Sequence, residues 1–277
     1  MPGSPAFILR RVGRYALLTV LAVVILFPLY MVVVQSLFRG VDFAARPPLL
    51  YPPSPQWSSY PTAWTDGHLG TYLRNSFIMT VCITAGQLLT SILAAYAFAF
   101  LHFPFKRTIF VIFLATMMIP LEVVFITNVV TVTSFGWYNT YAGLVVPSLA
   151  TGFGTFLLRQ AFLSLPRELR DAAAIDGFGD VRFLTRVVVP LARPTVAALA
   201  VLGFLGAWNQ YLWPLVVTKD DAMRTVQIGL KQLTGTSIDQ FNVTSAGTVL
   251  AFVPIVLILL IFHKQLVRGL TAGAVKG

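Results

Sequence analysis

The sequence contains one cysteine, three histidines and few charged residues, and each scarcity argues against a class of protein. The one cysteine, Cys82, lies inside an apolar run, so the chain has no disulfide framework. The histidines (His68, His102 and His263) lie far apart and lack the spacing of metal ligands. The sequence also has no Gly-x-x-x-x-Gly-Lys-Ser/Thr loop for a nucleotide, no evident paired acids and no Ser/His set. We therefore expect that the chain is not an enzyme and holds no metal or other cofactor of its own.

Charged residues make up only 11% of the chain, whereas hydrophobic residues make up 57% and the mean hydropathy is +0.79. This composition argues against a water-soluble globular domain. Six apolar runs are long enough to cross a bilayer as helices, for which about 20 residues are needed. They are about Tyr15–Leu37, Ser76–Phe100, Thr108–Val132, Tyr141–Leu158, Thr195–Val217 and Ser245–Phe262. The sequence thus predicts an all-α, polytopic membrane protein with six transmembrane helices in a domain 15–262, flanked by segments 1–14 and 263–277.

The apolar runs also carry signals for close packing and for kinks. Small residues recur every fourth position in the second run, as Gly86, Thr90 and Ala94, and such residues let helices approach closely in lipid. Prolines that can kink a helix lie within or near the ends of four runs: Pro120, Pro147, Pro214 and Pro254.

The distribution of basic residues predicts the orientation of the chain. Fourteen of the twenty lysines and arginines fall on one side of the six runs, and six fall on the other. By the positive-inside rule, both termini and the loop Arg159–Pro194 are expected in the cytoplasm. The net charge of +10 therefore indicates topology rather than a nucleic-acid partner. The arginines before the first run also fit a signal peptide, but the run's length and its lack of a small-residue cleavage site favour a retained anchor.

The loop Arg159–Pro194 is the most polar stretch, with six of the twenty basic residues and four of the ten acids. Pro166 and Glu168 favour a helix start, because the first turn tolerates proline and attracts negative charge. Gly177 predicts the end of that helix, and Asp180 is expected to cap a second one. On these signals alone, an ordinary cytoplasmic connector fits as well as a functional surface.

One spacing in this loop resembles a known motif. Asp171-Ala-Ala, three residues, Gly177, nine residues and Val187-x-Val189-Pro190 are similar to the EAA loop of bacterial ABC-importer permeases, Glu-Ala-Ala, three residues, Gly, nine residues, Ile-x-Leu-Pro. The chain departs from it by Asp for Glu and by Val for Ile and Leu. In this family the loop forms coupling helices that dock on the ATP-hydrolysing subunit. The resemblance implies that role for Glu168, Asp171, Ala172, Ala173, Asp176, Gly177 and Phe178.

The resemblance extends over nearly the whole chain. Four further stretches look like the maltose-type carbohydrate-uptake permeases: Thr71–Ser76, Thr140–Gly143, Phe156–Arg159 and Val267–Gly277. This resemblance implies the ABC importer type I permease fold and a multi-pass location in the bacterial inner membrane. It also implies three partners, namely a second related permease, an ATPase homodimer that binds the ATP and Mg²⁺, and an extracytoplasmic solute-binding protein.

Two stretches, Pro120–Val123 and Trp208–Leu215, resemble the glycerol-3-phosphate permease subtype more narrowly. The expected solute is then glycerol 3-phosphate or a glycerophosphodiester such as glycerophosphocholine. A permease for a di- or oligosaccharide is the alternative within the same family. An ion-coupled secondary transporter is a remoter one, because it should show several buried carboxylates and often duplicated halves.

Two features inside the runs could contact a solute. Glu122 is the only charged residue in the six runs, and a charge at the bilayer centre costs roughly 3 kcal/mol unless it faces protein or water. Trp208, Asn209, Gln210, Tyr211 and Trp213 combine amides with aromatic rings, which suit hydroxyl-bearing or cationic solutes. A structural role between helices explains either feature equally well. An anionic solute is a difficulty for both, since the runs contain no Lys or Arg.

Overall fold

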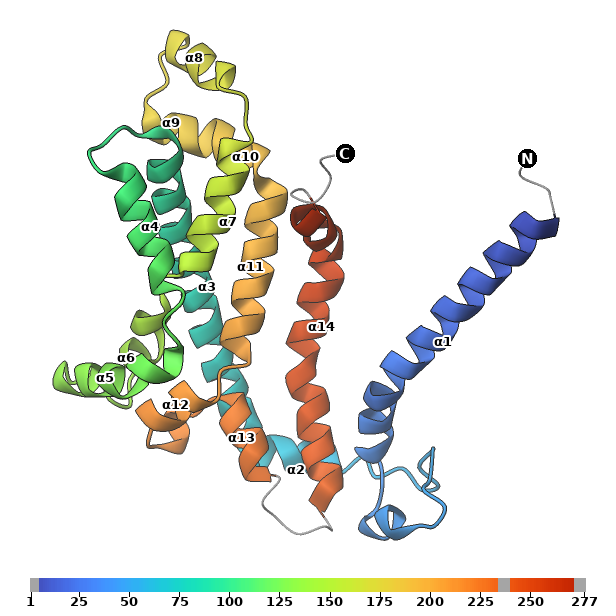
Figure 1. Cartoon of the computed structure of the whole chain (residues 1–277). Coiled ribbons are helices and arrows are strands. Elements are labelled where there is room, and N and C mark those ends of the chain that lie inside the picture. The colour runs from blue at the N-terminus through green and yellow to red at the C-terminus, as the bar shows by residue number, and fades with distance from the viewer. Residues whose placement is uncertain (1–4, 234–239, 272–277) are drawn as a thin grey trace. The chain divides into compact units, whose positions relative to one another are not determined.

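The computed structural model describes the backbone of residues 5–233 and 240–271 and the side chains of residues 11–120, 123–233 and 240–266. The regular structure in these ranges is helical, without a strand (Figure 1). The helices are α1 (Pro5–Gln35), α2 (Ser59–Thr65), α3 (Leu69–Phe100), α4 (Lys106–Thr116), α5 (Leu121–Ser134), α6 (Tyr141–Val145), α7 (Gly152–Leu163), α8 (Glu168–Ile175), α9 (Asp180–Phe183), α10 (Val189–Leu191), α11 (Arg193–Trp208), α12 (Leu212–Val217), α13 (Val226–Leu233) and α14 (Phe241–Thr271). Short 3₁₀ turns lie at Gly40–Ala44, Val146–Ser148 and Asp221–Met223, and a π-turn lies at Leu184–Val188.

Three helical stretches are long and apolar enough to cross a membrane without a break: Arg11–Gln35, Leu69–Phe100 and Phe241–Leu266. They correspond to the first, second and sixth predicted runs. The fourth run is bent by 44° between Tyr141–Ser148 and Gly152–Leu163. The number of membrane crossings stays a prediction, because the remaining runs are interrupted.

The third and fifth runs are not single helices, which corrects the sequence-based prediction. The third divides into α4 and α5, because Pro120 has no N–H for a helical bond and the residue before it is biased away from the helical region. The fifth ends at Trp208, and α12 begins four residues later. Pro214 lies in the first turn of α12, where its missing N–H is tolerated, but it would interrupt a helix that continued from α11.

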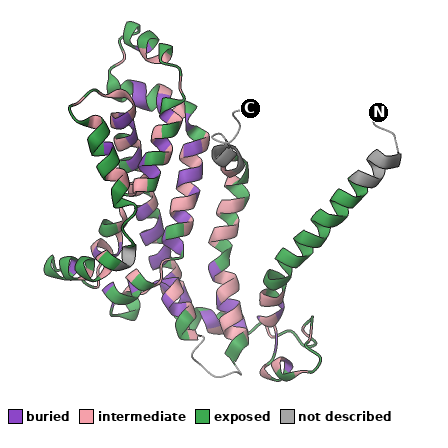
Figure 2. Ribbon diagram, viewed as in Figure 1, coloured by how far each residue is buried: buried purple, intermediate pink, exposed green. Residues whose placement is uncertain are grey.

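The chain divides into two compact units, residues 1–70 with 229–252 and residues 71–228 with 253–277. In the first unit, α1 exposes most of its apolar side chains from Val12 to Val33 (Figure 2). The chain after α1 is mostly exposed, but Ser36, Phe38, Asp42 and Ser59 are buried. Ser36 Oγ pairs with Tyr60 Oη at 2.8 Å, and Ser59 Oγ donates to the Ser36 carbonyl.

In the second unit, α3, α4, α7 and α11 lie side by side (Figure 1). Two groups of buried side chains hold them together. The loop core consists of Ala95, Tyr96, Leu158, Phe162, Ala173, Phe183, Leu184, Val188, Ala192 and Leu199. The second core consists of Met79, Ile83, Val132, Leu144, Ala207 and Val217. Because α3 contributes to both cores, it runs the length of the packed helices.

Small residues permit this packing, as their spacing predicts. A Cβ added at Gly86 would lie 2.3 Å from Leu149 Cδ2, and one added at Gly154 would lie 2.4 Å from Ser91 Oγ. Such separations are far below van der Waals contact, so only glycine fits at either position without displacing a neighbour.

Candidate coupling site

The polar loop between α7 and α11 folds into two helical parts, α8 and the segment Asp180–Leu191. The helix start that the sequence predicts near Pro166 is confirmed, because α8 begins at Glu168. Glu168 and Asp171 lie in its first turn, where the positive end of the helix dipole stabilises carboxylates.

Gly177 ends α8 in the conformation that the spacing predicts. Its φ of +72° lies in the left-handed region, which glycine adopts without a Cβ penalty. The Phe178 N–H donates to the Ala173 carbonyl at 2.8 Å, and the Gly177 N–H donates to the Ala174 carbonyl at 3.1 Å. This pair of bonds is a Schellman motif, which satisfies carbonyls that a helix end otherwise leaves free.

The second part of the loop differs from the simple helix that was expected. Gly179, not Asp180, is the N-cap of α9, and Asp180 is the first helical residue. Its Oδ1 instead accepts a 2.6 Å hydrogen bond from the hydroxyl of Tyr96 on α3. The π-turn follows and ends just before Pro190, which has no N–H for a regular helical bond. The chain then turns by 82° into α11.

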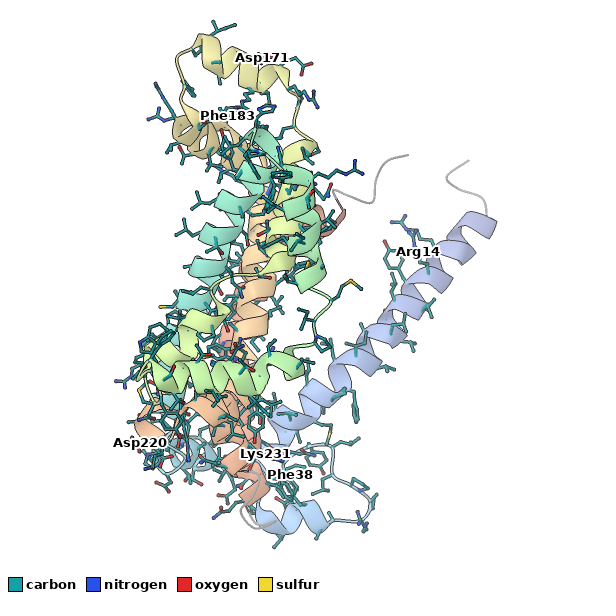
Figure 3. The ribbon with its side chains drawn as sticks, turned by 60° about the vertical axis from the view of Figure 1, so that its left-hand side comes forward. Arg14, Phe38, Asp171, Phe183, Asp220 and Lys231 are labelled. Atoms are coloured by element: carbon teal, nitrogen blue, oxygen red, sulfur yellow. The ribbon has the colours of Figure 1, made fainter. Side chains whose placement is uncertain are left out.

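The seven residues predicted to contact an ATPase fall into two groups. Glu168, Asp171, Ala172, Asp176 and Gly177 are exposed. Ala173 is buried in the loop core, and Phe178 is half-buried and packs against that core, so both side chains contact the chain's own helices. Contact of the seven residues with an ATPase stays a prediction. Figure 3 shows the same division, with Asp171 on the outer side of α8 and Phe183 on the inner side of α9.

Two exposed apolar side chains on this surface were missed from the sequence. Ile175 is 88% exposed and Val181 is 77% exposed, on a loop whose other exposed residues are mostly polar. Large exposed apolar groups rimmed by polar ones mark surfaces that a partner covers. The sequence feature that could have identified them is their position on either side of the turn at Gly177.

Cations from three elements converge on the end of α3, namely Lys106 of α4, Arg159 of α7 and Arg170 of α8, and Arg170 donates to the Phe100 carbonyl. Lys106 Nζ donates to the carbonyls of Leu101 at 2.8 Å and Ala99 at 3.3 Å, and Arg159 Nε donates to the Phe98 carbonyl at 3.3 Å. Positive groups are stabilised at this end by the helix dipole. Burial lowers the pKa of Lys106, and the nearby charges of two arginines lower it further.

Only some of the residues proposed for solute contact lie together, at the break between α11 and α12. Trp208 is buried at the end of α11 and stacks on Phe204 at 5.7 Å. In the described part of the chain, neither its indole Nε1 nor the buried Oε1 of Gln210 has a hydrogen-bond partner. Tyr211 lies half-buried in the break before α12.

The remaining solute candidates have structural partners or lie outside the description. Asn209 Nδ2 donates to the Leu205 carbonyl at 2.9 Å. Trp213 Nε1 donates to the Gly143 carbonyl at 3.1 Å, and its ring meets Phe125 edge-on at 5.8 Å, so this residue joins helices. Glu122 lies in the first turn of α5, but its side chain falls outside the described residues.

The sequence analysis also missed a set of hydrogen bonds that holds the loop after α12. Asn75 Nδ2 donates to the carbonyls of Ala222 at 2.8 Å and Arg224 at 2.9 Å, and its Oδ1 accepts a 2.6 Å bond from the Tyr141 hydroxyl. Asn139 Oδ1 accepts from the backbone N–H of Lys219 at 2.8 Å. Asn75 and Tyr141 both lie in stretches that carried the family resemblance. The resemblance therefore marked these residues, but it did not indicate that they hold this loop.

Comparison with known proteins agrees with this geometry. The model of the family "Binding-protein-dependent transport system inner membrane component" matches residues 87–272. An sn-glycerol-3-phosphate transport system permease protein, UgpE, of Yersinia pestis is 35% identical over 264 residues, which cover 92% of this chain and 94% of that protein. UgpE of Agrobacterium fabrum is 34% identical over 271 residues, covering 95% of this chain and 96% of the relative.

Solved structures show the same fold. A bacterial ABC transporter involved in the import of the acidic polysaccharide alginate contains a chain that matches with a TM-score of 0.82 at 22% identity, covering 95% of this chain and 98% of that one. A second alginate ABC transporter structure, in complex with an alginate pentasaccharide-bound periplasmic protein, matches with a TM-score of 0.64 at 15% identity, over 92% and 94% of the two chains. With the family model matching two thirds of its length, the chain belongs to the inner membrane components of binding-protein-dependent transport systems, and it is a multi-pass transport subunit rather than an enzyme.

Proposed function

We propose that this permease subunit forms half of the translocation pathway for sn-glycerol 3-phosphate or a glycerophosphodiester such as glycerophosphocholine. The proposal rests on relatives named for sn-glycerol-3-phosphate transport that align over 92% or more of this chain. A second related permease supplies the other half of the pathway. A solute-binding protein delivers the solute, and an ATPase homodimer binds the ATP and Mg²⁺.

The observation that carries the coupling role is the division of α8 into an inner and an outer side. Ala173 faces the loop core, whereas Asp171, Ala172 and Ile175 are exposed together with the turn at Gly177. A helix held on one side by packing and capped rigidly at its end can transmit a push from a partner on its other side. When ATP closes the ATPase pair, α8 follows as a lever and the helices of the second unit turn the pathway outward. Hydrolysis reverses the movement.

An anionic solute has to be neutralised elsewhere than on the spans of this chain. The buried and unpartnered groups near the break after α11 are the Trp208 indole N–H, which is a neutral donor, and the Gln210 Oε1, which is a neutral acceptor. We therefore place the charge recognition on the partner permease or on the binding protein. An oligosaccharide remains the second candidate solute, because a chain of an alginate importer has the same fold.

Transport by the reconstituted complex tests the solute. Vesicles that contain this chain, its partner permease and the ATPase should take up labelled sn-glycerol 3-phosphate only with ATP and the binding protein. Glycerophosphocholine and maltose are the matched competitors. Selective competition by maltose would transfer the assignment to sugars, and uptake by this chain alone along an ion gradient would refute the ATP-driven mechanism.

Labelling of one cysteine tests the orientation of the loop. Cys82 is the only cysteine, so the substitutions Cys82→Ser and Ile175→Cys leave a single thiol at a position that is 88% exposed in the native chain. In right-side-out vesicles, a membrane-impermeant maleimide should label it only after the membrane is opened. Labelling of intact vesicles would place the loop on the wrong side for an ATPase.

A further inference from the structure

Side-chain hydrogen bonds attach the polar loop to α3, and not to the two helices that flank the loop in sequence. Within Arg159–Pro194, which is described throughout, all side-chain hydrogen bonds to residues outside the loop end on α3 residues. Two of them come from the loop's own helices and join Tyr96 to Asp180 and Arg170 to the Phe100 carbonyl. The third joins Arg159, which is still part of α7, to the Phe98 carbonyl. The flanking helices α7 and α11 contribute apolar packing to the loop core. Directional contacts therefore single out one helix.

Asp180 connects three elements at this point. It is the first residue of α9, its Oδ1 accepts the 2.6 Å bond from Tyr96 on α3, and the same atom lies 3.7 Å from Arg170 of α8. Arg170 in turn donates to the Phe100 carbonyl at the end of α3. Hydrogen bonds with one ionised partner are shorter and about twice as strong as neutral ones. The three side chains thus fix α8, α9 and α3 to one another.

Aromatic packing supports the same connection. Phe183 of α9 lies edge-on to Phe100 at 5.5 Å between ring centroids, and Tyr96 lies 5.2 Å from Phe100. Phe183 is buried with 4% of its surface exposed, and Tyr96 with 5%. The Phe183–Phe100 pair resists sliding, since edge-to-face rings have a preferred arrangement. A displacement of α8 and α9 therefore has to displace the end of α3 as well.

We propose that Tyr96, Arg170 and Asp180 are positioning residues that transmit movement of the coupling loop to α3. This inference rests on the proposed coupling function and adds the route by which the movement enters the helices of the second unit. Neither Tyr96 nor Asp180 needs to touch the ATPase or the solute. Their loss should leave assembly intact and weaken the link between hydrolysis and transport.

The test compares two tyrosine substitutions that remove equivalent hydrogen bonds. Tyr96→Phe removes the 2.6 Å bond to Asp180, and Tyr141→Phe removes a 2.6 Å bond to Asn75, which lies outside the loop. Complexes with each variant are reconstituted with the ATPase, the partner permease and the binding protein. Two quantities are measured, the sn-glycerol 3-phosphate taken up per phosphate released and the ATPase subunit retained on purification.

We expect Tyr96→Phe to retain the ATPase and to lower the uptake per phosphate at least about fivefold, the lower end of typical coupling between sites. Tyr141→Phe leaves the Asn75 Nδ2 bonds to the Ala222 and Arg224 carbonyls in place, so it should keep the wild-type ratio even where its thermal stability falls equally. Asp180→Ala, which removes the acceptor, should reproduce the effect, and the double variant Tyr96→Phe/Asp180→Ala should be no worse than the stronger single variant, because both substitutions remove the same interaction.

Three outcomes separate this inference from the proposed function. A wild-type ratio for Tyr96→Phe, or equal losses for Tyr96→Phe and Tyr141→Phe, overturns the positioning role and leaves the coupling function standing. Multiplied losses in the double variant also overturn it, since the two residues then act independently. Failure of the wild-type chain to retain any ATPase overturns the coupling function itself and this inference with it.

Discussion

The left-handed turn at Gly177 yields the sharpest prediction, because its conformational and steric requirements can be separated. The φ of Gly177 is +72°, and a Cβ added there would meet no described atom within 4 Å. Any other L-residue therefore meets no clash within this chain and bears only the cost of the left-handed region, about 1–2 kcal/mol. Each 1.4 kcal/mol changes an equilibrium constant about tenfold. The equilibrium between the capped loop and its alternative conformations therefore shifts against the capped loop by about 5 to 30 times.

Two substitutions at Gly177 separate the conformational requirement from the steric one. Gly177→Ala changes the backbone preference and adds one methyl group, so we expect the ATPase to be retained and solute uptake to fall by up to about tenfold. Gly177→Phe has the same backbone cost and also projects a ring outward from the exposed turn. We expect it to prevent docking, and the ATPase subunit should no longer co-purify with the tagged permease from detergent-solubilised membranes.

Gly136 offers a matched control. Its φ is +70°, and a Cβ added there also meets no described atom within 4 Å, but it lies in the turn after α5 and not in the loop. Gly136→Phe has the same conformational cost and should leave ATPase co-purification unchanged. Normal retention and uptake in Gly177→Phe would refute the coupling role of this turn. Equal losses in the two variants would show that the effect is general destabilisation.

Three further predictions concern stability, measured by thermal unfolding of the purified chain in detergent. Asn75→Ala should destabilise the chain by about 2 kcal/mol, because two backbone carbonyls lose their donor. Gly154→Ala should destabilise it by about 1–3 kcal/mol, because the added Cβ would lie 2.4 Å from the Oγ of the buried Ser91. Gly206→Ala is the control: its added Cβ would meet no described atom within 4 Å, so this substitution should be neutral or stabilising. Hydrogen bonding to Arg39 lowers the pKa of Asp42, so the stabilisation from this carboxylate is complete above its ordinary value near 3.8 and is lost as the pH falls through the lowered pKa. The stability deficit of Asp42→Asn should therefore be present at pH 7 and disappear in strong acid, and a deficit that persists there would contradict the ion pair.

The loop could be predicted from the sequence because its requirements are local. A left-handed residue at the end of a helix favours glycine, and Gly177 lies four positions after Ala173, where the helical pattern stops. Acids cluster at a helix start for electrostatic reasons, so Glu168 was also predictable from its position. The direction of Ala173 was not readable. Three consecutive alanines, Ala172, Ala173 and Ala174, are alike, and only the packed structure shows that Ala173 is the one that faces the loop core.

The breaks in the third and fifth runs escaped prediction because hydropathy measures composition and not continuity. Pro120 and Pro214 were visible as possible kinks, but the end of α11 at Trp208 depends on a proline six residues further on. The two hydrogen-bonded connections were beyond sequence reasoning for another reason. Asn75 and Ala222 are 147 residues apart, and Tyr96 and Asp180 are 84 apart, so no local pattern joins them.

The two connections give α3 a particular place in the second unit. Near its start, Asn75 holds the loop after α12, and Ser76 Oγ accepts a 2.8 Å bond from the Val226 N–H. Near its end, Tyr96 and the last carbonyls hold the coupling loop. The two attachments lie about 20 residues apart, which is about 30 Å along a helix. One rigid helix thus joins a loop on one side of the predicted membrane to a loop on the other.

The middle of α3 is built differently from its ends. Among the described residues, Thr80 Oγ1, Thr84 Oγ1 and Ser91 Oγ are buried without a hydrogen-bond partner. Thr84 and Ser91 face glycines: an added Cβ at Gly203 of α11 would lie 4.0 Å from Thr84 Oγ1, and one at Gly154 of α7 would lie 2.4 Å from Ser91 Oγ. No directional bond from these hydroxyls fixes α3 to its neighbours there, whereas directional bonds fix both ends. Two other side chains in this stretch do make directional bonds: Gln87 Nε2 donates to the Ser148 carbonyl and Thr90 Oγ1 donates to the Leu149 carbonyl, each at 2.9 Å. Both acceptors lie in the turn before α7, so α3 is tied to that turn, whereas among the described residues its contact with α11 is by packing of side chains. A displacement that enters at the polar loop can therefore shift α3 against α11 more readily than against the turn before α7.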